Sequence, residues 1–153
     1  MSLTQHLVIF AKAPRLGTVK SRLAVDVGEV EARRIYLQMA EQTIRPLSRD
    51  AHWQSYLAIT PDNDALAGFG WSSPELARLP QGRGNLGERL GRIHRDLAPG
   101  PVIFIGTDLP DIDTERMGRA FKALGDHDAV IGPAGDGVYW LIGFKRRPRI
   151  LDV

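Results

Sequence analysis

Two carboxylates, Asp108 and Asp136, stand in loops where they could hold a hard cation. Asp108 follows the apolar run 102–105 and the small residues Gly106 and Thr107, and Asp136 lies between two glycines. Because the ligand crevice of an open α/β sheet lies beyond the carboxyl ends of its strands, a carboxylate there is well placed to bind Mg²⁺ or Mn²⁺. Each also has a plainer interpretation, since Asp108 could cap a turn and Asp136 could begin a hairpin. The residues alone leave both interpretations open.

A second stretch, residues 12–22, carries positive charge. It contains Lys12, Lys20 and Arg22, and Gly17 allows the backbone to fold tightly. Lysine binds phosphate oxygens as a point charge and arginine binds them as a planar fork, so this is a candidate phosphate-binding loop. It is neither a Walker A loop nor the dinucleotide-binding G-x-G-x-x-G sequence. A surface turn with solubilising charges would have the same composition.

A third stretch, residues 81–90, is rich in glycine and leads into a helical pattern. Asn85 is a good N-cap and Glu88 stands three residues later, as in a capping box. A capped helix with a loose entry therefore accounts for most of these residues. It does not account for Arg83, which stands between two glycines and is a candidate contact for a ribose or a base.

The apolar pattern predicts the scaffold that must gather these loops. The run at 102–105 is apolar without alternation, which is typical of a parallel strand buried under helices on both faces. The first predicted strand, helix and second strand form a right-handed crossover unit. We therefore expect a single α/β domain over residues 1–153, with helix layers on both faces of the sheet.

The elements can be placed along the chain. The predicted strands are residues 6–11, 52–60, 76–80, 102–105, 127–132 and 138–144, and the predicted helices are residues 29–47, 86–97 and 114–124. Pro46 is expected to end the first helix. Tyr36 and Met39 are expected to belong to the core, and Leu86 is expected to be buried by the second helix.

Composition excludes several classes of protein. The formal charge of the 153 residues is only +2, which is too balanced to indicate a nucleic-acid partner. The chain has no cysteine, and its four histidines show no ligand spacing, so thiolate and histidine metal sites are not expected. No apolar run is long enough to span a membrane, and no signal-peptide pattern begins the sequence. These features fit a cytoplasmic protein.

Four motifs occur in an order that resembles a bacterial family of glycosyltransferase-like proteins in the nucleotide-diphospho-sugar transferase superfamily. The motifs are F-A-K-A-P-R-L-G-T-V-K-S-R-L at 10–23, G-N-L-G-E-R at 84–89, G-T-D-L-P-D-I at 106–112 and G-P-A-G-D-G-V-Y-W-L-I-G at 132–143. Asn85 stands where the family usually has Asp, and Val138 where it usually has Gly. The family's usual C-terminal extension is also missing from this sequence, which ends at Val153.

The resemblance implies a GT-A fold, a three-layer α/β/α arrangement with a mostly parallel mixed sheet. It implies that the first loop binds a nucleotide or nucleotide-sugar, and that Asp108 binds a divalent metal with help from Asp136. The D-x-D formed by Asp111 and Asp113 is not interpreted as the metal motif, because it follows Pro110 and Asp113 can cap the next helix.

Three functions remain open from the sequence. The first is a metal-dependent transferase that uses a nucleotide-sugar and a small-molecule acceptor, with Lys20 and Arg22 adding positive charge at the donor phosphates. The second is nucleotidyl transfer to a phosphorylated small molecule, and the third is a non-catalytic nucleotide-binding module. Asp111, Asp136 and Glu88 are all candidates for a general base.

Overall fold

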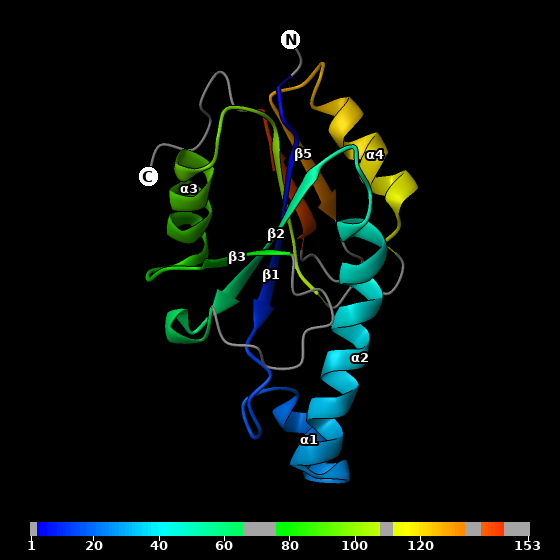
Figure 1. The fold of residues 1–153 in the computed structure, drawn as a ribbon, viewed down its shortest axis with the longest axis vertical. Helices are drawn as coiled ribbons and strands as arrows, with labels where there is room; N and C mark the ends of the chain where they lie inside the picture. Colours follow the sequence, from blue (N-terminus) through cyan, green and yellow to red (C-terminus); the bar gives the residue numbers. More distant parts are fainter. Residues whose placement is uncertain (1–2, 66–75, 108–111, 134–138, 146–153) are drawn as a thin grey trace.

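The computed structural model describes residues 3–65, 76–107, 112–133 and 139–145. The strands in these ranges are β1 (His6–Lys12), β2 (Gln54–Thr60), β3 (Ala77–Pro80), β4 (Val102–Ile105), β5 (Ala129–Pro133) and β6 (Tyr139–Phe144). The helices are α1 (Ser21–Val27), α2 (Glu29–Ser48), α3 (Leu86–Asp96) and α4 (Thr114–Ala123), with a short 3-10 helix η1 (Asp62–Asp64) after β2 (Figure 1).

The described strands form one sheet in the order β3-β2-β1-β4-β6-β5. β1 pairs in parallel with β2 and β4, and β2 pairs in parallel with β3. β6 is antiparallel to both of its neighbours, β4 and β5. The predicted mostly parallel mixed sheet is therefore confirmed.

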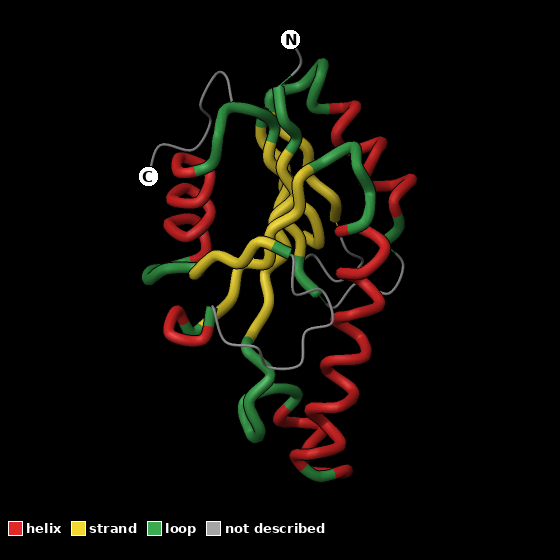
Figure 2. The backbone as a smooth tube through the Cα atoms, in the orientation of Figure 1, coloured by secondary structure: helices red, strands yellow, loops and turns green. Residues whose placement is uncertain are grey.

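Helices cover both faces of the sheet. Figure 2 shows α2 and α4 on one side of the strands and α3 on the other. Alternate residues of β1 divide between the two faces, as the strand period requires: Leu7 and Ile9 belong to the larger apolar cluster, whereas Val8 belongs to the smaller one beneath α3. This confirms the three-layer α/β/α arrangement.

The N-terminal part of the helical layer differs from the sequence prediction. The candidate phosphate-binding loop was expected to reach residue 22, and no helix was predicted before residue 29, but residues 21–27 form α1. This helix packs as a hairpin against α2 beyond the edge of the sheet (Figure 1). The prediction that Pro46 ends α2 is wrong, because the helix continues to Ser48. Leu47 is fully buried and its carbonyl accepts a hydrogen bond of 2.8 Å from the Trp53 indole, so packing holds this last turn despite the proline.

The prediction that Leu86 is buried is also wrong. Leu86 begins α3 and is 57% exposed, whereas Leu90 and Ile93, further along the same helix, are buried against the sheet. It borders a concavity of about 200 Å³ whose other lining residues include Phe10, Gly106 and Trp140. An exposed apolar side chain therefore lies beside the end of β4.

Candidate functional site

The loops singled out in the sequence leave the same edge of the sheet. β1, β2, β3 and β4 run in parallel, so the residues that follow them emerge at their common carboxyl edge. β1 and β4 are direct neighbours, with Ile9 paired to Ile105. The main chain after β4 is anchored by the buried Thr43, whose hydroxyl donates to the carbonyl of Thr107 at 3.3 Å.

The predicted metal ligands Asp108 and Asp136 lie outside the described residues. Gly106, at the end of β4, is described, and a Cβ built on it would meet no atom of the described residues within 4 Å. Within the described parts of the chain, no group of three or more histidine or acidic side chains is arranged to hold a metal ion. The metal site therefore remains a prediction from the motifs.

Residues 12–22, which we call the basic loop, line part of a concavity of about 750 Å³. Lys12, Lys20 and Arg22 all line it, together with Tyr36 and Met39 from α2. The structure thus brings together the three basic side chains of this loop that were predicted from the sequence to bind phosphate. Gly17 shapes the turn between them with a φ of 80°, a value that L side chains rarely adopt.

Lys20 has an unusual backbone conformation. Its φ of 51° and ψ of 45° place it in the left-handed region, and its carbonyl accepts the first hydrogen bond of α1 from the nitrogen of Ala24, at 2.9 Å. A non-glycine residue there costs roughly 1–2 kcal/mol. Such strain persists where the surrounding structure determines the conformation, and it is common at functional sites.

α2 holds the basic loop from one side. The Tyr36 hydroxyl accepts from the backbone nitrogen of Lys12 at 2.9 Å and donates to its carbonyl at 2.7 Å. Arg33 donates to the carbonyl of Pro14 at 2.5 Å. Tyr36, expected only in the core, thus also fixes the end of β1. No signal in the sequence distinguishes this role from that of an ordinary buried aromatic residue.

η1 holds the same loop from the other side. The Arg15 guanidinium donates to both carboxylate oxygens of Asp64, at 2.6 Å from Nε and 2.5 Å from Nη2. Asp64 is only 3% exposed. The hydrogen bond from Arg15 holds the pKa of the Asp64 carboxyl below its usual value, against the opposing effect of desolvation. Sequence analysis missed this pair, because nothing near either residue indicates its partner.

The glycine-rich loop is tied to the sheet by Gln81. Its side-chain amide, which is buried, donates to the carbonyls of Ala11 and Ala58, at 3.0 Å each, and its oxygen accepts from Arg89 at 3.0 Å. Gln81 therefore connects β1, β2 and α3. Sequence reasoning gave it no role, because a glutamine in a loop is usually solvated.

The remaining candidates in this region have separate positions. Arg83 lines another concavity, of about 540 Å³, with Asp62 and Arg92, and its contact with a ribose or base stays a prediction.

The Asn85 side chain accepts from the backbone nitrogen of Glu88 at 2.9 Å, which confirms it as the N-cap of α3. Asp113 likewise caps α4 by accepting from the nitrogen of Arg116 at 2.8 Å.

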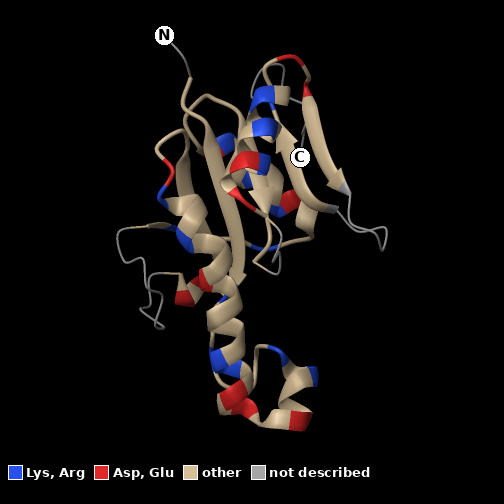
Figure 3. Cartoon of the chain, turned by 90° about the vertical axis from the view of Figure 1, so that its right-hand side faces the viewer, with Lys and Arg blue, Asp and Glu red and all other residues tan. Residues whose placement is uncertain are grey.

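The charge of the helical hairpin is mixed. Figure 3 shows both acidic and basic positions on α1 and on the adjoining part of α2, so the outer surface is not a uniformly basic face. The cations that line the 750 Å³ concavity are therefore a local feature of the site. Among the described helices, none has both the length and the apolar composition needed to cross a membrane.

Comparison with known proteins identifies the fold. The chain is similar to the crystal structure of a "putative nucleotide-diphospho-sugar transferase" from Desulfovibrio desulfuricans G20, with 32% identity, a TM-score of 0.88, and coverage of 99% of this chain and 67% of that one. It also resembles 4-diphosphocytidyl-2C-methyl-D-erythritol synthase from Anaerococcus prevotii DSM 20548, with 16% identity, a TM-score of 0.62, and coverage of 94% and 72%. The fold is that of the nucleotide-diphospho-sugar transferases.

A third similar structure is CMP:2-keto-3-deoxy-manno-octonic acid synthetase complexed with CTP, with 12% identity, a TM-score of 0.55, and coverage of 94% of this chain and 75% of that one. None of the curated proteins matches the chain. The chain belongs to the family described as "Uncharacterized protein conserved in bacteria (DUF2064)", whose model matches residues 43–152. The resemblance stated from the motifs is thereby confirmed.

Proposed function

We propose that the chain is a transferase that binds a nucleotide-activated donor, most simply a nucleotide-sugar, at the carboxyl edge of its sheet. The observation that carries this proposal is the concavity shared by Lys12, Lys20 and Arg22 beside the end of β1. Fixed cations in a preorganised loop favour phosphate oxygens, and they stabilise the charge that builds up on a phosphate leaving group. The left-handed conformation of Lys20 supports a functional role for this residue.

Similarity to other proteins supports the same class of ligand. The Desulfovibrio protein, 32% identical over 99% of this chain, is described as a "putative nucleotide-diphospho-sugar transferase", and a more distant protein of the same fold is complexed with CTP. In this proposal Lys20 and Arg22 contact the diphosphate of the donor, and Arg83 contacts its ribose or base. A small-molecule acceptor would approach from beyond β4.

We also propose that Asp108, assisted by Asp136, holds Mg²⁺ or Mn²⁺. Carboxylates with backbone carbonyls and water form the donor set that these hard cations prefer, and the chain has no cysteine to favour a softer metal. When bound, such an ion would neutralise part of the charge on the donor phosphates. This part of the proposal rests on the motifs at 106–112 and 132–143.

Nucleotidyl transfer is the second candidate function. It is favoured by the fold that this chain shares with 4-diphosphocytidyl-2C-methyl-D-erythritol synthase and with CMP:2-keto-3-deoxy-manno-octonic acid synthetase. Both reactions would use the same phosphate-binding cations, but they break different bonds. Glycosyl transfer releases a nucleoside diphosphate, whereas nucleotidyl transfer from a triphosphate releases pyrophosphate.

A thermal-shift screen of nucleoside triphosphates and nucleotide-sugars, with and without Mn²⁺, tests the proposal. A ligand that binds the folded protein raises its Tm, and the ligand that does so indicates which product to assay. Asp108→Ala should remove the Mn²⁺-dependent part of the shift and leave the Tm of the ligand-free protein nearly unchanged. A destabilised Asp108→Ala protein with unchanged ligand binding would show that Asp108 is only a turn cap.

A further inference from the structure

η1 lies between the two loops assigned to the ligand, and each of its aspartates bonds to one of them. Asp64 accepts two hydrogen bonds from Arg15 in the loop after β1. Asp62 accepts one from the backbone nitrogen of Gly82 in the loop after β3, at 3.0 Å. We call Arg15, Asp62, Asp64 and Gly82 the η1 bracket. It spans three neighbouring parallel strands at their carboxyl ends.

The Arg15 half of the bracket organises the turn that leads to Lys20. The backbone nitrogen of Arg15 donates to Ala13 at 2.8 Å, and its carbonyl accepts from both the nitrogen and the hydroxyl of Thr18, at 3.2 and 2.8 Å. Ala13 in turn donates to the carbonyl of Thr60 at 2.9 Å, just before η1. Holding the Arg15 side chain therefore fixes the backbone on both sides of Gly17.

The burial of Asp64 makes this contact specific. Its carboxylate is almost fully enclosed, whereas the Arg15 side chain keeps 55% of its surface exposed. A buried carboxylate that loses its charged partner is strongly unfavourable, so the loop cannot move Arg15 away without a cost to the fold. A surface ion pair would exert no such restraint, because solvent replaces either partner.

We propose that the η1 bracket is a positioning device that holds the basic loop and the glycine-rich loop in the relative positions that bind the nucleotide. Arg15, Asp62 and Asp64 act through the residues they hold rather than by contact with the ligand. The inference rests on the proposed function, because it concerns the same nucleotide site. When the loops are already ordered in the free protein, binding does not have to order them. Loss of the bracket should therefore lower the affinity for the nucleotide without removing any of its contacts.

The test compares Arg15→Ala and Asp64→Asn with the wild-type chain in two measurements. The first is hydrogen exchange of the backbone amides at 18–20 and at Gly82 in the ligand-free protein. The second is the Kd of CTP with Mg²⁺ and of a nucleotide-sugar. Both variants should speed exchange in these loops and weaken the nucleotide on the order of tenfold, because the loops must then be ordered when the nucleotide binds. Arg15→Lys, which keeps the charge but not the fork, should recover part of the affinity.

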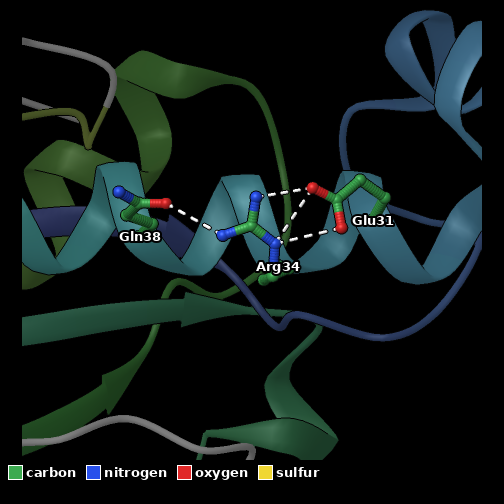
Figure 4. Close-up of polar contacts among 3 residues, drawn as sticks. All are labelled: Glu31, Arg34 and Gln38. Carbon is green, nitrogen blue, oxygen red and sulfur yellow. Dashed lines mark hydrogen bonds and ion pairs between the residues drawn. The ribbon is translucent and has the colours of Figure 1, made fainter.

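The matched control is Arg34→Ala. Figure 4 shows that Arg34 bonds to Glu31 and Gln38, all on α2, so this arginine makes a carboxylate pair that connects no loops. The control should change neither measurement. A reversed pair, Arg15→Asp with Asp64→Arg, should restore part of the exchange protection if the bond between the loops is what matters.

The two measurements separate the bracket from the proposed function. Unchanged exchange and unchanged Kd in Arg15→Ala would overturn the bracket even if the wild-type protein binds nucleotide well. A wild-type protein that binds neither CTP nor any nucleotide-sugar would overturn the proposed function and the positioning role that rests on it, whatever the exchange rates are. If Asp64→Asn does not fold, Arg15→Ala and Arg15→Lys give the same decision.

Discussion

The carboxyl-edge loops and the outer face of α2 each contain an arginine bonded to a carboxylate through two nitrogens. The Nη2–O distance is 2.5 Å in both Arg15–Asp64 and Arg34–Glu31. The first carboxylate is buried, and its partner comes from another loop. The second retains 43% of its side-chain exposure and lies three residues from its partner on one helix. The comparison shows that contact geometry alone does not determine what an ion pair does.

The difference follows from desolvation and from what each pair connects. Glu31 and Arg34 are solvated with or without each other, so their bond supports one turn of an already formed helix. Asp64 has lost its water, and Arg15 supplies the replacement from a segment far away in the chain. Only the second arrangement transmits a restraint between elements. The carboxyl edge is therefore expected to be the restrained and functional region.

The largest expected effect is that of Lys20→Ala on nucleotide affinity. Loss of one charge-assisted phosphate contact should weaken binding roughly ten- to a hundredfold, both with and without metal. Lys20→Gly should lose the same affinity but retain a Tm equal to or above that of Lys20→Ala, because glycine adopts the left-handed conformation without strain. Titration calorimetry and melting curves measure the two quantities.

The control for Lys20 is Lys122→Ala, an exposed lysine in the last turn of α4. It should leave nucleotide affinity unchanged. If Lys122→Ala and Lys20→Ala weaken the nucleotide equally, the effect of Lys20 is only a change in net charge, and the basic loop has no special place in the molecule.

Two glycines sharpen the comparison between the site and the hairpin tip. Gly17 and Gly28 have φ values of 80° and 88°, so alanine at either position should destabilise the fold by about 1–3 kcal/mol. A Cβ on Gly17 would lie 3.2 Å from the carboxylate of Glu29, whereas one on Gly28 would meet no atom within 4 Å in the part of the chain that the structure describes. Chemical denaturation measures both losses.

Nucleotide affinity should separate the two glycines. Gly17→Ala should also weaken the nucleotide, because Gly17 shapes the turn before Lys20, whereas Gly28→Ala should not. Equal affinity in the two variants, at equal loss of stability, would mean that the conformation of the turn does not matter for binding.

The smallest expected effect is the pH dependence of stability. The folded pKa of Asp64 is lowered, so its ion pair stabilises the protein fully above the unfolded carboxyl pKa of about 3.9 and loses this contribution as pH falls through the folded pKa. Asp64→Asn should therefore be less stable than wild type near neutral pH, and the gap should close in acid. Urea denaturation at a series of pH values measures it.

Glu31→Gln is the matched variant on α2. Arg34 also lowers the pKa of the Glu31 carboxyl, chiefly through a hydrogen bond, so the direction of the pH effect is the same. Solvent screens this exposed pair, and the gap between Glu31→Gln and wild type should be smaller at every pH. A larger gap for Glu31 than for Asp64 would reverse the comparison between the two regions.

Local features of the chain were predictable from the sequence because their causes lie within a few residues. The apolar run 102–105 coincides with β4, and the caps at Asn85 and Asp113 begin α3 and α4 as expected. The apolar periodicity also predicted both helix layers and the parallel strands, because each face of the sheet must be buried. The common edge of the candidate loops follows from that topology.

Only the tertiary structure decided how the site is held together. Arg15 and Asp64 are 49 residues apart, and Gln81 reaches the carbonyl of Ala11 across 70 residues, so no local pattern indicates either contact. Packing likewise carried α2 past Pro46 and left Leu86 exposed at the edge of the sheet. The sequence by itself determined where the described strands, the helices α2, α3 and α4 and the candidate loops lie, but it did not predict α1. The partners that fix those loops depend on the crossing of distant segments, because a hydrogen bond forms only where the fold brings donor and acceptor together.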